Sequence, residues 1–103
     1  MTQTHRQLLQ ATATLVGRWP LGIKCHGVLR AVLETNSALD SAAEEALCNS
    51  GYESPAVGQL YDELRALVAQ GLLFGRGDLR LPAGPRYTEC GITPAGRAVL
   101  ADE

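Results

Sequence analysis

The segment from residue 54 to residue 73 limits most strongly what this chain can fold into, because it specifies a helix, both of its ends and the strand that follows. Ser54 is a good N-cap and Pro55 a favourable first helical residue. Apolar side chains then recur at three- and four-residue steps, which places them on one helical face. They are Val57, Leu60, Tyr61, Leu64, Leu67 and Val68. Gly71 permits the positive φ with which a helix turns into a strand, so the helix is predicted to end there and residues 72–74 to form a short strand.

Three further helices are predicted before this segment. Residues 3–18 carry apolar side chains at helical spacing, and the Trp19-Pro20 pair should end that helix because the residue before a proline disfavours helical geometry. Residues 21–33 repeat the helical pattern. Ser41 is expected to cap a short helix over residues 42–47, with Glu44 completing an S-x-x-E capping box.

A β-hairpin and one more helix are predicted after it. The two strands are residues 72–74 and 86–93, with a loop over the Gly-rich stretch 75–84, and Thr93 caps a helix that begins at Pro94. No repeat or linker interrupts the chain, so the elements should share one core. We therefore predict one domain over residues 1–103, of mainly α class with a small β-hairpin (α+β). Its parts are an N-terminal accessory helix (1–20), a helical unit (21–73), a hairpin (74–93) and a C-terminal helix (94–103).

Two segments resemble motifs of one superfamily. Residues 60–73, LYDELRALVAQGLL, resemble the Y-x-x-L-x-x-L-x-x-x-G-L-[LIV] run that closes the third helix of PadR-like and MarR-like bacterial regulators. Residues 92–100, ITPAGRAVL, look like the L-T-x-x-G-R-x-x-L run that follows the wing in the same families. The resemblance covers residues 23–100 and implies a winged helix-turn-helix, a fold in which a hairpin wing follows three helices. It further implies a bacterial or phage regulator of transcription that binds double-stranded DNA.

The composition bears on other classes. With 46% apolar and 19% charged residues, the chain can form a packed core and is not typical of disordered sequences. No apolar run approaches the roughly 18 to 20 residues that cross a bilayer, and residues 1–10 are polar where a secretory signal is apolar. We therefore expect no membrane partner and a cytoplasmic location.

The cysteines favour neither zinc nor an iron–sulfur cluster. Cys25, Cys48 and Cys90 are odd in number and widely spaced, without the close pairs of a structural zinc site. They fall in the second helix, at the end of the third and in the return strand, rather than together near the wing. We expect reduced, mostly buried thiols, no metal and no cofactor.

Charge is strongly segregated along the chain. Residues 1–33 carry four bases and no acid, whereas residues 34–63 carry seven acids and no base. Residues 64–97 are again net basic, with five arginines against two acids. Because the phosphate backbone dominates nucleic-acid binding, any DNA-binding hypothesis must account for the acidic middle of the chain.

Candidate DNA contacts lie on the helix 54–70 and on the hairpin. On the predicted outer face of that helix only Gln59 offers a ready base-edge donor, because Asp62 and Glu63 repel phosphate. Arginines on the flexible hairpin suit a phosphate or a narrow minor groove, although solvated loop residues are the alternative interpretation. The predicted DNA-binding residues are Gln59, Arg65, Arg76, Arg80, Arg86 and Arg97.

Catalysis is not expected. A nucleophile needs a base within hydrogen-bond reach, yet His5 is near the terminus and His26 follows Cys25 directly, where helical neighbours diverge. Adjacent acids such as Glu44 and Glu45 fit a solvated helix face. We predict no enzyme.

The N-terminal helix offers apolar area for dimerisation through Leu8, Leu15 and Trp19, and a two-fold axis would match a palindromic DNA site. The alternative is that this helix packs on its own domain. The leading functional hypothesis is a small, non-enzymatic winged-helix regulator of transcription that binds double-stranded DNA. Its rival is a winged-helix protein-interaction module or inhibitor whose acidic helices bind a basic surface on another protein.

Overall fold

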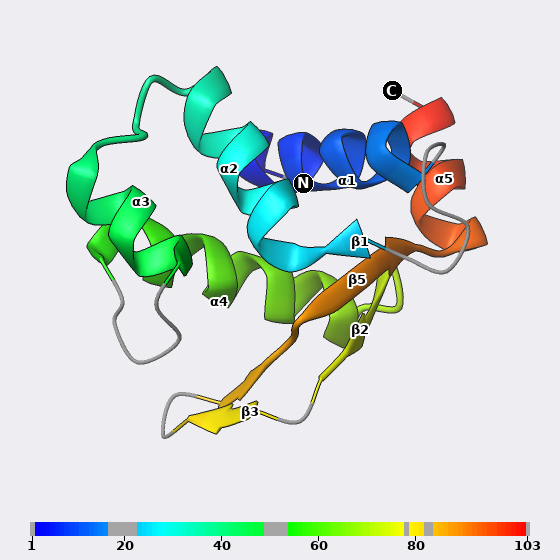
Figure 1. The fold of residues 1–103 in the computed structure, drawn as a ribbon. Coiled ribbons are helices and arrows are strands. Elements are labelled where there is room, and N and C mark those ends of the chain that lie inside the picture. Colours follow the sequence, from blue (N-terminus) through cyan, green and yellow to red (C-terminus); the bar gives the residue numbers. More distant parts are fainter. Residues whose placement is uncertain (1, 17–22, 49–53, 78, 82–83, 103) are drawn as a thin grey trace.

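A computed structural model describes residues 2–16, 23–48, 54–77, 79–81 and 84–102. Helices dominate this part of the chain, and short antiparallel strands complete it (Figure 1), so the α+β class is confirmed. The elements in chain order are α1 (Gln3–Val16), β1 (Ile23–Lys24), α2 (Cys25–Thr35), α3 (Ser41–Cys48), α4 (Pro55–Ala69), β2 (Leu73–Arg76), β3 (Leu79–Leu81), β4 (Gly84–Arg86), β5 (Glu89–Ile92) and α5 (Pro94–Ala101).

Strand β1 corrects the predicted start of the second helix. The sequence pattern placed residues 23 and 24 inside that helix, whereas they form the edge strand of a sheet with the order β1-β5-β2. Ile23 lies opposite Cys90 and Lys24 opposite Glu89, and the backbone N–H of Cys25 donates to the carbonyl of Thr88 at 3.0 Å. The open edge of β5 supplies backbone partners that helical periodicity cannot reveal.

The hairpin is more regular than expected. Strand β2 extends to Arg76, and the return strand β5 begins at Glu89 rather than at Arg86. The predicted loop 75–84 is wrong in part, because β3 and β4 pair as a second ladder that runs from Leu79 opposite Arg86 to Leu81 opposite Gly84. Glycines and prolines obscured the strand alternation in this stretch.

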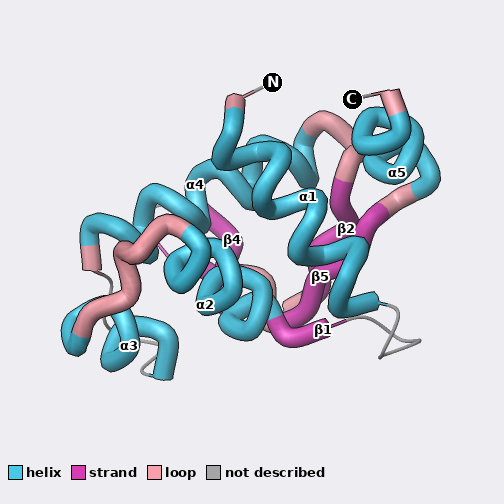
Figure 2. The backbone as a smooth tube through the Cα atoms, turned by 90° about the horizontal axis from the view of Figure 1, so that it is seen from above, coloured by secondary structure: helices cyan, strands magenta, loops and turns pink. Residues whose placement is uncertain are grey.

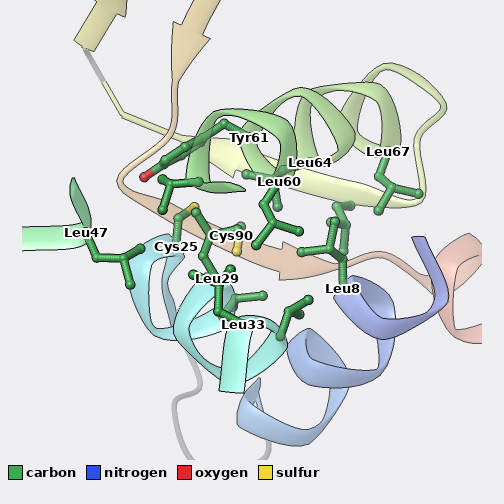
Figure 3. Close-up of a cluster of buried hydrophobic side chains, with 14 of the residues drawn as sticks. Leu8, Cys25, Leu29, Leu33, Leu47, Leu60, Tyr61, Leu64, Leu67 and Cys90 are labelled. Carbon is green, nitrogen blue, oxygen red and sulfur yellow. The ribbon is translucent and has the colours of Figure 1, made fainter. Parts of the chain in front are cut away.

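The predicted inner face of α4 is confirmed. Its leucines and Tyr61 are buried, and Val68 is half-buried. Figure 3 shows side chains of α4, α1 and α2 meeting in one cluster beside the sheet, where Cys25 and Cys90 also lie. The fully buried residues include Leu29, Leu64 and Leu67.

Helix α1 is part of this core, which corrects its assignment as an accessory element. Leu8 and Leu9 have no exposed surface, and α1 packs against α2, α4, α5 and β5. The view from above shows α1 crossing over the sheet, with α5 at its side (Figure 2). The helix ends at Val16, and the predicted stop at Trp19-Pro20 lies outside the described residues.

Side-chain caps begin α3, α4 and α5, and Thr2 Oγ1 accepts the N–H of His5 at 3.2 Å at the start of α1. The Ser54 hydroxyl accepts the N–H of Val57 at 3.2 Å, as predicted for α4. The predicted Ser41 cap of α3 is wrong, because Ser41 is already helical and Asp40 Oδ1 accepts the N–H of Ala43 at 2.8 Å. Asp40 is one residue earlier and caps as well as serine does, so the sequence offered both candidates.

The third cap joins the two segments on which the family resemblance rests. The Thr93 hydroxyl accepts the N–H of Gly96 at 3.1 Å and donates to the carbonyl of Gly71 at 2.6 Å. The Thr93 N–H also donates to the carbonyl of Leu72 at 3.2 Å. Gly71 itself has φ +76°. The end of α4, the start of β2 and the start of α5 are therefore fixed to one another.

Gly96→Ala should lower the free energy of unfolding by about 1 to 3 kcal/mol, the usual cost of overpacking. A Cβ at this position would meet the backbone carbonyl oxygen of Leu72 and lie 2.8 Å from Cγ1 of Ile92. The control is Gly27→Ala in α2, where nothing lies within 4 Å of the added carbon. That variant should gain about 0.5 to 1 kcal/mol, because alanine is the better helix former. Urea denaturation measures both, and equal effects of the two substitutions would contradict the packing at Gly96.

Candidate nucleic-acid interface

The outer face of α4 is open to solvent over most of its length. Pro55, Gln59 and Asp62 are exposed, whereas Glu63 and Ala66 are half-buried, in agreement with the predicted orientation of the helix. Gln59 therefore presents its amide on a surface that no described element covers. Because this side chain both donates and accepts hydrogen bonds, it is suited to the edge of an adenine.

Arg65 does not belong to that open surface. Its guanidinium forms an ion pair with the Asp62 carboxylate one turn earlier, and only 14% of its side chain is exposed, against 71% for Asp62. The prediction of Arg65 as a DNA-binding residue thus meets a side chain that is largely buried and already paired with an acid. The pair also offsets the negative charge of Asp62 on the outer face of α4.

The acidic middle of the chain is partly neutralised by the basic N-terminal third. Arg30 of α2 donates a hydrogen bond to Glu44 of α3 at 2.8 Å, and His5 of α1 contacts Glu63 of α4. The hydrogen bond to Glu44 is the main cause that raises the pKa of the Arg30 guanidinium above its ordinary value. One base of the N-terminal third is thus paired with one acid of the middle segment, which offsets part of the negative charge there.

The hairpin brings three of the predicted arginines into one region. Arg76 is exposed at the end of β2, where its carbonyl accepts the N–H of Thr88 at 2.8 Å and the Thr88 hydroxyl at 3.1 Å. Arg80 lies in β3 opposite Pro85, and Arg86 lies in β4. The β3–β4 ladder thus places Arg80 and Arg86 on a paired β-ribbon rather than on an irregular loop, while Arg76 belongs to β2 of the three-stranded sheet.

Arg97 lies apart from this region. It is exposed on α5, and α5 follows the end of β5 that is farthest from the hairpin tip (Figure 1). The structure therefore does not bring Arg97 together with the hairpin arginines, and its predicted DNA contact stays a prediction.

The predicted dimerisation face also changes. Leu8 is completely buried within the chain's own core, so its assignment to an exposed apolar face is wrong. Leu15 is half-buried and packs against the core cluster, and Trp19 lies outside the described residues. A helical pattern shows which residues share a face but not what covers that face.

The cysteine and histidine side chains of the described residues do not form a common reactive cluster. Cys25 and Cys90 are buried and Cys48 is exposed, all as free thiols. His26 is exposed on α2. Among the residues that the structure describes, no group of three His, Cys, Asp or Glu side chains could hold a metal ion.

One exposed residue escaped the sequence reasoning. Phe74 on β2 is 41% exposed, whereas its neighbour Leu73 is buried. Residues 72–74 are all apolar, so alternation could not tell which side chain faces outward. The available sequence signal was Gly91, because a glycine in a strand leaves room for a large side chain nearby. Phe74 lies opposite it in the ladder.

No protein-family model, curated protein or solved structure matches this chain. Over the described residues, none of the helices has the length and apolar character needed to cross a membrane. Functional inference therefore depends on the geometry described above.

Proposed function

We propose that this chain is a winged-helix domain that binds double-stranded DNA and regulates transcription without catalysis, in a bacterium or a phage. The observation that carries the proposal is the common location of α4 and the arginine-bearing hairpin on the side of the molecule opposite α1 (Figure 1). In helix-turn-helix proteins one helix enters the major groove, and a neighbouring hairpin can reach the backbone or the minor groove.

The connections between the elements support this proposal. Helix α4 passes through Gly71 directly into β2, and β5 returns through Thr93 into α5. Strand β1 attaches the start of α2 to β5. The helices and the hairpin are therefore held in a fixed relation, as a domain that contacts two parts of a duplex requires.

Each contact would have a distinct role. Arg76, Arg80 and Arg86 would bind phosphates or a narrow minor groove and supply most of the affinity. Gln59 would contact a base edge and supply discrimination between sequences. The Asp62–Arg65 pair limits repulsion where α4 approaches the backbone.

Titration with mixed-sequence duplex at about 50 mM and about 200 mM salt tests the proposal, with fluorescence anisotropy as the readout. We expect a dissociation constant of about 10⁻⁴ to 10⁻⁶ M, typical of non-specific binding, and clear weakening at the higher salt concentration. The absence of binding at about 50 mM salt, where such contacts are strongest, would contradict it.

The competing proposal is a protein-interaction module or inhibitor that binds a basic partner surface. It is favoured by one observation, the exposure of Glu34, Asp40 and Glu45 at the end of α2 and along α3. Double substitution Asp40→Asn and Glu45→Gln distinguishes the two proposals. Under the DNA proposal it leaves duplex affinity unchanged or slightly raised, whereas under the rival proposal it weakens binding to a basic protein and duplex does not bind.

A further inference from the structure

The outer face of the three-stranded sheet carries an exposed aromatic ring. Of the described large apolar side chains, Phe74 alone is exposed. Side chains alternate between the two faces of a strand, so Phe74 and Arg76 share one face of β2, while Leu73 lies on the opposite, buried face. On β5, Cys90 is likewise buried on the core side. The ring of Phe74 is therefore on the side of the sheet that faces away from the core cluster.

A glycine holds this ring against the sheet. Gly91 lies directly opposite Phe74 in the β2–β5 ladder, and a Cβ at Gly91 would meet three carbons of the Phe74 ring. The ring thus occupies the space that a side chain at position 91 would take, and Gly91 is buried beneath it. One side of the ring rests on backbone, and much of the remainder is open to solvent.

An exposed cation accompanies the ring. Arg76 is two residues further along β2 on the same face and is exposed, and the half-buried Glu89 lies opposite it on β5. Its backbone is fixed by the two hydrogen bonds from Thr88. An aromatic surface beside a cation matches the two parts of a nucleotide in a single strand, because the base offers a π-face and the backbone a negative phosphate.

We propose that this sheet face binds single-stranded nucleic acid, with a base stacked on Phe74 and an adjoining phosphate bound by Arg76. Stacking of splayed bases on sheet aromatics is a general mode of single-strand recognition, and it tolerates any sequence because every base has a π-face. The site goes beyond the proposed duplex function, since the base of the hairpin rather than its tip carries the ring. It would hold one strand where a duplex is opened.

The decisive experiment compares the full chain with its Phe74→Leu and Phe74→Tyr variants. Binding to labelled oligothymidylate of about 12 nucleotides, and to a duplex of the same length, is measured by anisotropy at low salt. Phe74→Leu keeps an apolar side chain without a π-face and should weaken single-strand binding by about 5- to 100-fold, whereas Phe74→Tyr should bind within about twofold of the parent. Duplex affinity should be unchanged in both variants. Arg76→Ala should lower the magnitude of the single-strand salt slope by about 0.7, corresponding to one phosphate contact.

A second readout does not depend on any variant. The fluorescence of 2-aminopurine in an oligonucleotide changes when the base leaves its neighbouring bases and stacks on a protein ring, so the parent chain should change it. Failure of the parent to bind single strands or to change this fluorescence would overturn the inference, as would equal single-strand affinity of parent and Phe74→Leu. Duplex binding without single-strand binding rejects this site and leaves the proposed function standing. Single-strand binding without duplex binding rejects the proposed function and leaves this site standing.

Discussion

Leu64→Ala and Leu67→Ala should each lower the free energy of unfolding by about 2 to 5 kcal/mol. Both side chains have no exposed surface, and both belong to the central cluster of buried side chains (Figure 3). Truncation removes apolar burial and leaves a cavity that the helices on the far side cannot fill without moving. For a small domain this loss is a large fraction of a total stability of about 5 to 15 kcal/mol. Urea denaturation should show a lower midpoint with an unchanged slope.

Gln59→Ala is the matched control on the same helix. Its side chain is exposed, and replacing it should change the free energy of unfolding by no more than about 0.5 kcal/mol. If both leucine variants lost less than about 0.5 kcal/mol, the buried face of α4 would be wrongly assigned. A changed slope would instead indicate a change in the unfolded state or a departure from two-state behaviour.

Local signals predicted α4 well because every one of them agreed. The Ser54-Pro55 start, the apolar spacing and Gly71 each act within a few residues, and the structure confirms all three. The Thr93-Pro94 start of α5 was equally readable, for the same reason. Where caps, periodicity and turn chemistry coincide, a sequence defines an element without tertiary information.

Long-range contacts account for what was missed. Strand β1 is two residues long and exists because β5 offers it an edge, although the paired residues Lys24 and Glu89 are 65 positions apart in the sequence. The structural role of α1 follows from the burial of Leu8 and Leu9 by elements far along the chain. Neither the β1–β5 pairing nor the burial of α1 can be predicted from a short stretch of neighbouring residues.

The candidate site was predicted in part. The exposure of Gln59 follows from helical periodicity alone, and so does the outer position of Asp62. The burial of Arg65 does not, although its spacing of three residues from Asp62 was a recognisable ion-pair signal. The separation of Arg97 from the hairpin depends on the direction of β5 and could not be read from sequence.

The fold places a base of the basic N-terminal segment next to an acid of the acidic middle segment. Attraction between the basic and acidic segments is realised in the Arg30–Glu44 bridge, which joins α2 to α3. Exposed pairs of this kind contribute little to stability. The larger effect of this pair is on the surface potential, since it offsets one negative charge of α3 and so lessens the repulsion that a polyanion bound at the hairpin would meet.

Replacing both Arg76 and Arg80 by alanine should therefore remove most duplex affinity at low salt. If each arginine neutralises one phosphate, the magnitude of the slope of log K against log salt falls by about 1.8. When the contacts are purely electrostatic, that slope corresponds to an affinity loss of about 200-fold at 50 mM salt and about 20-fold at 200 mM. The loss should be the same for every DNA sequence, because phosphates carry no base information. Anisotropy titrations over this salt range measure both quantities.

Arg97→Ala and Gln59→Ala are controls. They separate phosphate contacts of the hairpin from an effect of net charge and from contacts with bases. Arg97 is also an exposed arginine, but it lies beyond the far end of β5, so its removal subtracts a positive charge without touching the hairpin and should leave the slope nearly unchanged. Gln59→Ala should leave the slope unchanged as well and cost about 1 to 3 kcal/mol only at a preferred sequence, because its contact is with a base edge. An equal slope change in Arg97→Ala and in the double variant would mean that net charge, rather than the hairpin, attracts DNA. A double variant that binds as tightly as the parent, with the parent's slope, would remove the hairpin from the interface.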